Sequence, residues 1–473
     1  MRILHTSDWH LGRTFHGRVL DDAHAVFADH LVELARAEAV DAVVVSGDVY
    51  DRAIPPTDSV RLLDETLRRL SDITRVILTP GNHDSARRLG FASDLLREGL
   101  TIRARIADVD RPVIVPGPDG GDGLYVYALP YLDPDAARET LPPLLADRLG
   151  EEMADAARTA DPDAARTAPE GAGGHSEKAA GDPPGTASDA ATRRLPRSHE
   201  AVVSGALRLV AADLAARRAA APARVPALVM SHAFVVGGLP SEESERDIRV
   251  GGVDSVPAGL YAGLGGSPLA ERSGGLDYAA LGHLHRPQEI RQRSAAVGPA
   301  GPHPDDDAVI TGPRLVYSGS PLPFSFPEAD FPKSTVLLDI GADGVTRLER
   351  VPAPLPYRAV TLTGTLEKVL ALTPDHREDW VRVRLNGAAP PDAMARLKVE
   401  LPNLLAFSRT PPPRAEGERA PVTRASDPLE VADRFLARML GRSARPDERA
   451  VIARAYDAAR AANEGSPSCD CTR

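Results

Sequence analysis

The first 130 residues alternate between short apolar runs and longer segments in which apolar residues are spaced for a helix. Val40–Ser46 and Arg75–Thr79 are β-branched and almost wholly apolar, as expected for strands that are buried on both faces. The residues at helical spacing are Phe27, Leu31 and Leu34 in one segment and Val60, Leu63, Leu67 and Leu70 in another. Strand, helix and strand in this order predict βαβ units.

Three further strands are predicted after residue 200, so the first domain is expected to extend over residues 1–335. These strands are Ala227–Ser231, Leu276–Leu281 and Arg314–Tyr317. The domain is interrupted by residues 151–200, where thirteen residues are Ala and the only large apolar side chains are Met153 and Leu195. Such a segment buries too little surface to offset its ordering entropy, and we expect a low-complexity insertion that is disordered or partly helical. Ala295–Asp307 is predicted to be an exposed loop.

The pattern changes at about Ser334, where separated strand-like pieces predict a small α/β domain over residues 336–412. The pieces are Thr335–Ile340, Ala359–Leu362 and Trp380–Leu385. A linker at Pro411–Pro413 is predicted to precede two helices within residues 425–465. The first is capped by Asp427 and carries apolar side chains at Val431, Phe435, Met439 and Leu440, and the second covers Ala450–Ala462.

The charge of the chain narrows the possible functions. The chain has 473 residues, with 56 Lys and Arg against 67 Asp and Glu, and a formal net charge of −11 at pH 7. Residues 1–200 hold 23 basic and 34 acidic side chains, which accounts for the whole deficit. A protein that coats nucleic acid through non-specific electrostatics would be basic. The acidic balance therefore excludes that class, but not a nucleic-acid enzyme whose positive charge comes from bound metal ions.

Cysteine content and hydropathy bear on the cellular compartment. Cys469 and Cys471 are the only cysteines and lie in the last five residues, where they cannot staple a domain. No apolar run approaches the ~20 residues that span a bilayer, and Met1–His5 lacks the apolar stretch of a signal peptide. We therefore expect a soluble protein of the reducing cytoplasm.

Five short polar clusters directly follow strand-like runs. They are Asp8-Trp9-His10, Gly47-Asp48, Gly81-Asn82-His83-Asp84, Ser231-His232 and Gly282-His283-Leu284-His285. Each cluster alone is as well explained by a helix cap, a turn or a structural histidine. Ligands bind at the carboxyl ends of the strands in an open α/β sheet, so clusters in this position can converge. Their oxygen and nitrogen donors suit Mn²⁺, Fe²⁺ or Zn²⁺, and together the five clusters predict a metal centre.

The order D-x-H, GD, GNHD, H and GHxH resembles that of the calcineurin-like metallophosphoesterase family. Within this family, five longer stretches are similar to the nuclease subunits of bacterial SbcCD complexes. They are His5–Gly12, Gly47–Asp51 with Pro55-Pro56, Ala128–Tyr131, Ser231–Gly238 and Tyr317–Phe326. The resemblance covers residues 1–150 and 200–340 well and is looser beyond them. It implies an α/β fold, a four-layer α/β/β/α sandwich with a small α/β capping domain and C-terminal helices.

The resemblance also implies two divalent metal ions, with Mn²⁺ as the expected species, and a role for each site residue. One ion would be held by Asp8, His10, Asp48 and His285, and the other by Asp48, Asn82, His232 and His283, so that Asp48 bridges them. A pair of cations ~3.5–4 Å apart supports in-line displacement at phosphorus. His83 would act as general acid, and Asp84 would orient it. Relatives outside bacteria often carry His at the position of Asp51, so no role is carried over to that residue.

The implied activity is that of a DNA nuclease in DNA repair, recombination and replication. It would act as a 3′→5′ exonuclease on duplexes and as an endonuclease on hairpins and single strands. Its partner would be an SbcC-type ATPase, and a homodimer of the nuclease chain is implied as well. The helices of residues 425–465 are candidates for docking on that ATPase, and the alternative is a helical cap on the chain's own domain.

Two other functions are compatible with parts of this pattern. A small-molecule phosphoesterase would use the same dinuclear core, but it needs neither the domain after residue 340 nor the segment Tyr317–Phe326. A scaffold that only regulates an ATPase has no need for a set of convergent metal donors.

Overall fold

The computed structural model describes residues 1–150, 194–240, 255–290, 312–386, 390–410, 428–440, 442–443 and 445–464. The chain divides into two compact units, Met1–Thr410 and Pro411–Arg473, and each is described by itself. Most of the predicted insertion, the loop at 295–307, the linker, Asp427 and both cysteines lie outside the described residues.

The first unit is built around two six-stranded sheets. The first sheet has the order β14 (Gly344–Pro352), β13 (Ser334–Gly341), β1 (Arg2–Thr6), β4 (Ala42–Ser46), β5 (Arg75–Thr79) and β6 (Leu100–Ile102). The second has the order β11 (Gln288–Ile290), β12 (Arg314–Tyr317), β10 (Tyr278–Gly282), β9 (Ala227–His232), β8 (Asp122–Ala128) and β7 (Val113–Pro116). The strands from β1 to β6 and from β12 to β8 run parallel, and antiparallel strands complete the edges.

The strands of the first sheet are buried on both faces, as their unbroken apolar runs predict. In β4, Ala42 and Val44 face the second sheet, where they share a core with Met230 of β9. The alternate residues Val43 and Val45 face helices α1 (Asp21–Ala37) and α2 (Thr57–Ser71). This period of two is that of a strand between two apolar layers.

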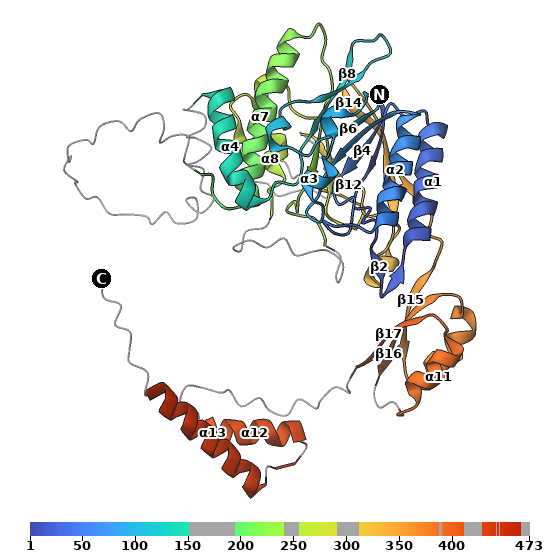
Figure 1. Ribbon diagram of the computed structural model, residues 1–473, viewed down its shortest axis with the longest axis vertical. Helices are drawn as coiled ribbons and strands as arrows, with labels where there is room; N and C mark the ends of the chain where they lie inside the picture. The colour runs from blue at the N-terminus through green and yellow to red at the C-terminus, as the bar shows by residue number, and fades with distance from the viewer. Residues whose placement is uncertain are drawn as a thin grey trace, which may run out of the picture. The chain divides into compact units, whose positions relative to one another are not determined.

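The second sheet is covered on its outer face by two long helices, α4 (Pro134–Leu149) and α7 (His199–Ala220). The first helix begins at Asp133, whose carboxylate accepts from two backbone N–H groups of the first turn, and the second is capped by Ser198. Leu195, at the end of the predicted insertion, is fully buried in this core. Helices α1 and α2 therefore lie on one side of the paired sheets and α4 and α7 on the other (Figure 1), which confirms the four-layer α/β/β/α sandwich.

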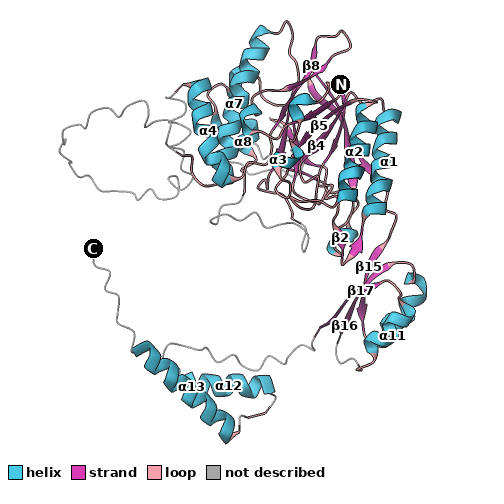
Figure 2. Cartoon of the chain, in the orientation of Figure 1, coloured by secondary structure: helices cyan, strands magenta, loops and turns pink. Residues whose placement is uncertain are grey.

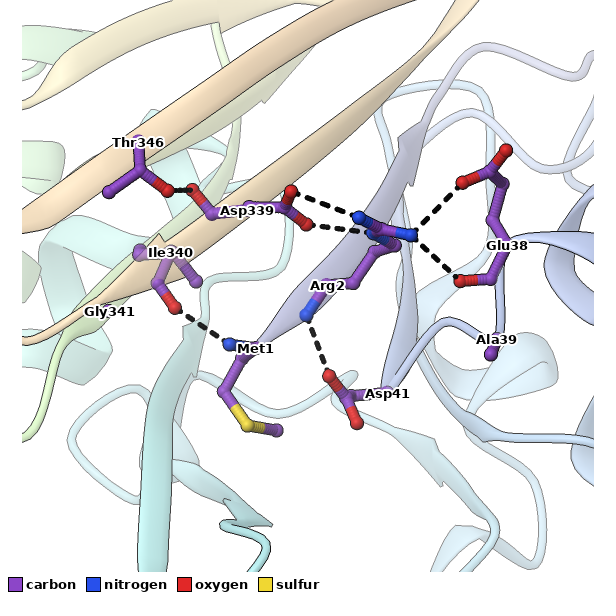
Figure 3. Close-up of a pocket in the computed structure, with 9 residues that line it drawn as sticks. All are labelled: Met1, Arg2, Glu38, Ala39, Asp41, Asp339, Ile340, Gly341 and Thr346. Carbon is purple, nitrogen blue, oxygen red and sulfur yellow. Dashed lines mark hydrogen bonds and ion pairs between the residues drawn. The ribbon is translucent and has the colours of Figure 1, made fainter.

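The boundary expected at residue 335 is wrong, because β13 and β14 belong to the first sheet. β13 pairs antiparallel with β1, with Leu337 opposite Leu4. At the edge shown in Figure 3, the Arg2 guanidinium bonds the Asp339 carboxylate at 2.8 and 3.1 Å, and the amino group of Met1 donates to the carbonyl of Ile340 at 2.9 Å. The apolar run at 335–340 indicates a strand correctly, but it does not indicate which sheet the strand joins.

A separate three-stranded parallel sheet follows, with the order β15 (Ala359–Gly364), β16 (Trp380–Asn386) and β17 (Leu404–Thr410). Helices α10 (Leu366–Leu372) and α11 (Ala393–Glu400) pack on it, as Figure 2 shows for α11. The ring of Trp380 lies 5.3 Å from that of Phe15, in the hairpin formed by β2 (Thr14–Phe15) and β3 (Arg18–Val19). The small α/β domain thus begins at β15.

The second unit contains α12 (Pro428–Leu440) and α13 (Pro446–Glu464), as the sequence predicts. Phe435 and Met439 on α12 are 61% and 54% exposed. In the part of the chain that the structure describes, no helix is both long enough and apolar enough to cross a membrane.

Candidate metal centre

The loops that follow β1 and β4 run side by side beyond the end of the sheet. The backbone N–H groups of Asp8 and His10 donate to the carbonyls of Gly47 and Asp48 at 3.1 and 3.0 Å. Asp8, His10 and Asp48 all have left-handed backbone conformations, with φ of 54°, 46° and 46°. A left-handed conformation costs a non-glycine residue roughly 1–2 kcal/mol, and such residues cluster at functional sites. The paired loops hold these three side chains in one place.

The second sheet approaches these loops closely because glycine stands at the contact. A Cβ on Gly282 would overlap the carbonyl oxygen of Ser46, and a Cβ on Gly81 would overlap the Asp48 backbone and carboxylate. The approach brings the ring of His232 to 3.0 Å from the Ser46 carbonyl, through Nδ1. The two sheets therefore contribute to a single site.

All seven predicted metal ligands converge at this junction. Two groups of buried donors are formed, Asp8 with His10 and His285, and Asp48 with His232 and His283, and within each group the donor atoms lie within 4.8 Å of one another. The seventh residue, Asn82, places its Oδ1 2.9 Å from Nε2 of His232 and 3.3 Å from Nδ1 of His283.

Asp48 lies between the two groups. Its Oδ2 is 3.6 Å from Nε2 of His10 and 3.3 Å from Nε2 of His232. Burial alone would raise the pKa of this carboxyl, but the neighbouring His232 and His10 hold it well below its ordinary value. The carboxylate is thus anionic and central, as a bridging ligand must be.

The donor atoms fit divalent cations. Nε2 of His10 and Nε2 of His285 face each other at 3.0 Å, and two imidazole lone pairs in this position need a cation or a proton between them. Burial holds the pKa values of His10 and His283 well below the ordinary value, which favours the neutral rings that metals bind. Burial would also lower the pKa of His232, but Asp48 raises it to about 9. In the metal-free chain a proton therefore occupies the position of a cation at that ring.

His83 lies at the open side of the site. Its backbone N–H donates to Oδ1 of Asp48 at 2.8 Å, and its ring Nε2 is 4.0 Å from Oδ2 of the same carboxylate. The side chain is 10% exposed and lines a surface pocket with Arg13, Thr14, Asp51 and Arg52. The donor atoms of His83 also form a group with those of His10 and Asp48. The geometry is that of a residue beside the metal ligands with access to solvent.

The expected contact between Asp84 and the His83 ring is wrong. The Asp84 carboxylate accepts three backbone N–H groups, from Val49 at 3.0 Å, Tyr50 at 2.9 Å and Gly81 at 2.9 Å. Burial and the charge of Asp48 raise the pKa of Asp84 to about 7. This carboxylate ties the loop after β5 to the loop after β4, so it positions the site through the backbone.

Two contacts of the site were missed in the sequence. Nδ1 of His83 lies 2.7 Å from the backbone carbonyl of Asp51, and Nδ1 of His285 lies 3.0 Å from Oε1 of Glu328. A backbone carbonyl has no residue-type signal, and Glu328 stands outside every cluster that follows a strand. His5 is buried between the sheets, with its Nδ1 3.0 Å from the hydroxyl of Tyr278, and His16 packs on Phe326, so neither is among the convergent donors.

Two family models match the chain. Residues 1–136 match the model described as calcineurin-like phosphoesterase, and residues 356–439 match the model described as type 5 capsule protein repressor C-terminal domain. The first range contains the loops after β1, β4 and β5, and the second begins just before β15.

Relatives are similar over most of the chain. The D subunit of the nuclease SbcCD from Rhodobacter capsulatus is 32% identical over 384 residues, which are 78% of this chain and 75% of that protein. The protein of the same name from Bacillus subtilis is 31% identical over 341 residues, which are 72% of this chain and 66% of that protein. The one from Escherichia coli strain K12 is 26% identical over 386 residues, which are 78% of this chain and 73% of that protein.

Proposed function

Because the chain belongs to the SbcD family, the D subunits of SbcCD nucleases, we propose that it is a metal-dependent DNA nuclease whose active centre lies where its two sheets meet. The observation that carries the proposal is the position of the Asp48 carboxylate between donor groups supplied by both sheets. In this proposal one divalent ion is held by Asp8, His10, Asp48 and His285, and a second by Asp48, Asn82, His232 and His283. The proposed ion is Mn²⁺, since borderline imidazole and hard carboxylate donors are mixed in each set.

When bound, two divalent cations supply Lewis-acid polarisation of a phosphodiester and neutralise the charge that develops at phosphorus. The chain itself binds and orients the substrate and moves a proton. His83 holds a proton at Nε2 for the leaving oxygen, because the Asp51 carbonyl fixes its Nδ1–H. Arg13 and Arg52 line the same pocket and carry the positive charge for the backbone phosphates of DNA.

The proposed activity on DNA is twofold, 3′→5′ exonuclease action on duplexes and endonuclease action on hairpins and single strands. In cells it would serve DNA end processing in the cytoplasm. The proposed partner is an SbcC-type ATPase, since the relatives are named as subunits of a two-component nuclease. The exposed apolar residues Phe435 and Met439 of α12 support a docking role for the terminal helices.

A homodimer of the nuclease chain is the second proposed assembly. Phe91 and Leu95, which follow α3 (Ala86–Leu89), are 82% and 83% exposed, and large apolar side chains exposed together indicate an interaction surface. Light scattering on the full chain should give the mass of a dimer, and Phe91→Glu with Leu95→Glu should reduce it to that of a monomer. A monomeric mass for the wild type at micromolar concentration would contradict this assembly.

The test of the nuclease proposal uses the full chain with its ATPase partner, hairpin DNA, Mn²⁺ and ATP. His83→Gln should reduce cleavage by about 10²–10⁴-fold, the contribution of a general acid, with Mn²⁺ binding retained. The matched control is His376→Gln, in the small domain, where the ring contacts Asp379 and no site residue. Undiminished cleavage by His83→Gln would remove His83 from the proposal. Rapid hydrolysis of a nucleotide monoester without attack on DNA would favour the small-molecule phosphoesterase.

A further inference from the structure

A buried ion pair lies directly behind the donor group of Asp8, His10 and His285. Glu328, in the 3₁₀ turn Pro327–Asp330, is fully buried, and its Oε1 lies 3.0 Å from Nδ1 of His285. Its other oxygen contacts Nζ of Lys333, whose side chain is also fully buried. A buried pair of this kind carries a desolvation cost that packing alone does not repay.

The ammonium group of Lys333 is well matched to its surroundings. Besides Glu328, its Nζ lies 2.8 Å from Oγ of Ser320 and 3.1 Å from the carbonyl oxygen of His285. Its three N–H donors thus have three oxygen acceptors, one of them the backbone of the same histidine that Glu328 contacts. The chain has only four lysines among its 56 basic residues, and the compact cation stands at this position. The pair grips His285 by its ring and by its backbone.

The hydrogen bond to Glu328 decides which nitrogen of His285 faces the site. A carboxylate only accepts hydrogen bonds, so Nδ1 of His285 carries the proton and Nε2, opposite His10, carries the lone pair. Burial alone would raise the pKa of Glu328, but Lys333 and His285 hold it well below the ordinary value.

We propose that Glu328 is a positioning residue for the metal centre, which fixes the ligand tautomer of His285, and that Lys333 holds Glu328 in place as its buried counter-ion. The inference rests on the proposed dinuclear centre and specifies a third partner for one of its two ions. Carboxylates behind a metal-binding histidine raise metal affinity by about 10–100-fold. Because His285 belongs to only one donor group, the effect is confined to one of the two ions.

The experiment measures Mn²⁺ binding to the full chain by calorimetry and by electron paramagnetic resonance of free Mn²⁺. The wild type should bind two ions per chain, and Glu328→Gln, which keeps size and removes charge, should weaken one of them by about 10–100-fold. Lys333→Met should weaken the same ion. In the double variant E328Q/K333M no charge is left unpaired, so the melting temperature should recover while the weak Mn²⁺ site persists.

A purely structural role would not produce this division between stability and affinity. The matched control is Asp277→Asn, which breaks another buried ion pair, with Arg218, at the start of β10 and away from the site. It should lower the melting temperature and leave both Mn²⁺ affinities unchanged. If Glu328→Gln does not fold, ¹⁵N spectra of histidine-labelled wild-type chain report the tautomer of His285 directly, and a proton at Nε2 would overturn the proposal.

The outcomes separate this inference from the nuclease proposal. Two ions in the wild type with one weakened in Glu328→Gln support it, whatever the chain does to DNA. Two ions with both affinities unchanged, or with both reduced equally, overturn it and leave the nuclease proposal standing. A wild type that binds no second Mn²⁺ overturns it together with the dinuclear centre.

Discussion

The Cα of Gly282 packs against the carbonyl oxygen of Ser46 so closely that a single methyl group at residue 282 would overlap it. Gly282 ends β10 of the second sheet, and Ser46 ends β4 of the first. The carbonyl of Ser46 is also the partner of His232 Nδ1. One backbone contact therefore sets the separation of the two sheets at the point where their donors meet.

Gly282→Ala should separate the sheets and weaken the site. The neighbour is backbone, which moves with difficulty, so we expect a loss of about 1–3 kcal/mol or more in the free energy of unfolding. Mn²⁺ affinity should fall as well, because His232 and His283 move relative to Asp48. Urea unfolding and calorimetry measure the two effects. Gly259→Ala, at a position where a Cβ meets nothing within 4 Å, is the control and should change neither.

Asp84→Asn should affect stability more than catalysis. Its carboxylate accepts three backbone N–H groups, and an amide in its place sets an N–H₂ donor against at least one of them. The expected cost is about 1–3 kcal/mol of stability. Hairpin cleavage should fall by less than it does in His83→Gln, because Asp84 does not contact the His83 ring. Loss of cleavage equal to that of His83→Gln, with stability unchanged, would restore Asp84 as the orienting residue.

His24 should make the first unit sensitive to acid. Its ring is buried, with Nε2 2.9 Å from the carbonyl of Trp9, and burial lowers its pKa to about 4. The unfolded chain takes up this proton near pH 6.5 and the folded chain only near 4, so stability is lost as the pH falls between these values. The loss is about 3 kcal/mol. His24→Gln keeps a donor for Trp9, so its unfolding midpoint should depend less steeply on pH than that of the wild type, and equal slopes would contradict the prediction.

Phe435→Glu with Met439→Glu should impair assembly with the ATPase. Both side chains are exposed on α12, and charged residues in an apolar docking surface should weaken binding by at least about tenfold, which corresponds to about 1.4 kcal/mol. Pull-down and interferometry with the purified partner measure the effect. Val399→Glu, at an apolar residue of the small domain that is 71% exposed, serves as the control. Binding unchanged by the double variant would favour a helical cap on the chain's own domain.

Strands buried on both faces could be predicted from the sequence almost to the residue. Arg75–Thr79 and Arg314–Tyr317 coincide with β5 and β12, because an apolar run between polar ends has one length that fits. The donor clusters were also recognisable, since Asp, Asn and His after such runs have no role in packing. Their convergence follows from the parallel order of the strands.

The rest depended on pairing between distant parts of the chain. The run at 335–340 indicates a strand but carries no signal for its neighbour, so its place beside β1 was missed. Helix α7 is apolar on several sides, and its residues Val202, Leu207 and Leu214 do not form the single stripe that marks a surface helix. The contacts of His83 with the Asp51 carbonyl and of His285 with Glu328 arise only in the folded chain.

The pairing of β1 with β13 also sets an order of events during synthesis. Arg2 and its partner Asp339 are 337 positions apart, and at about 5–20 residues per second a ribosome needs roughly 20–70 s to make the chain between them. Throughout that interval β1 is present without its antiparallel neighbour, and an unpaired strand edge is a template for aggregation. His285 is also made only after most of this interval. A nascent chain of this protein thus spends most of its synthesis without a complete first sheet, which makes it a natural client for chaperones that cover exposed strand edges.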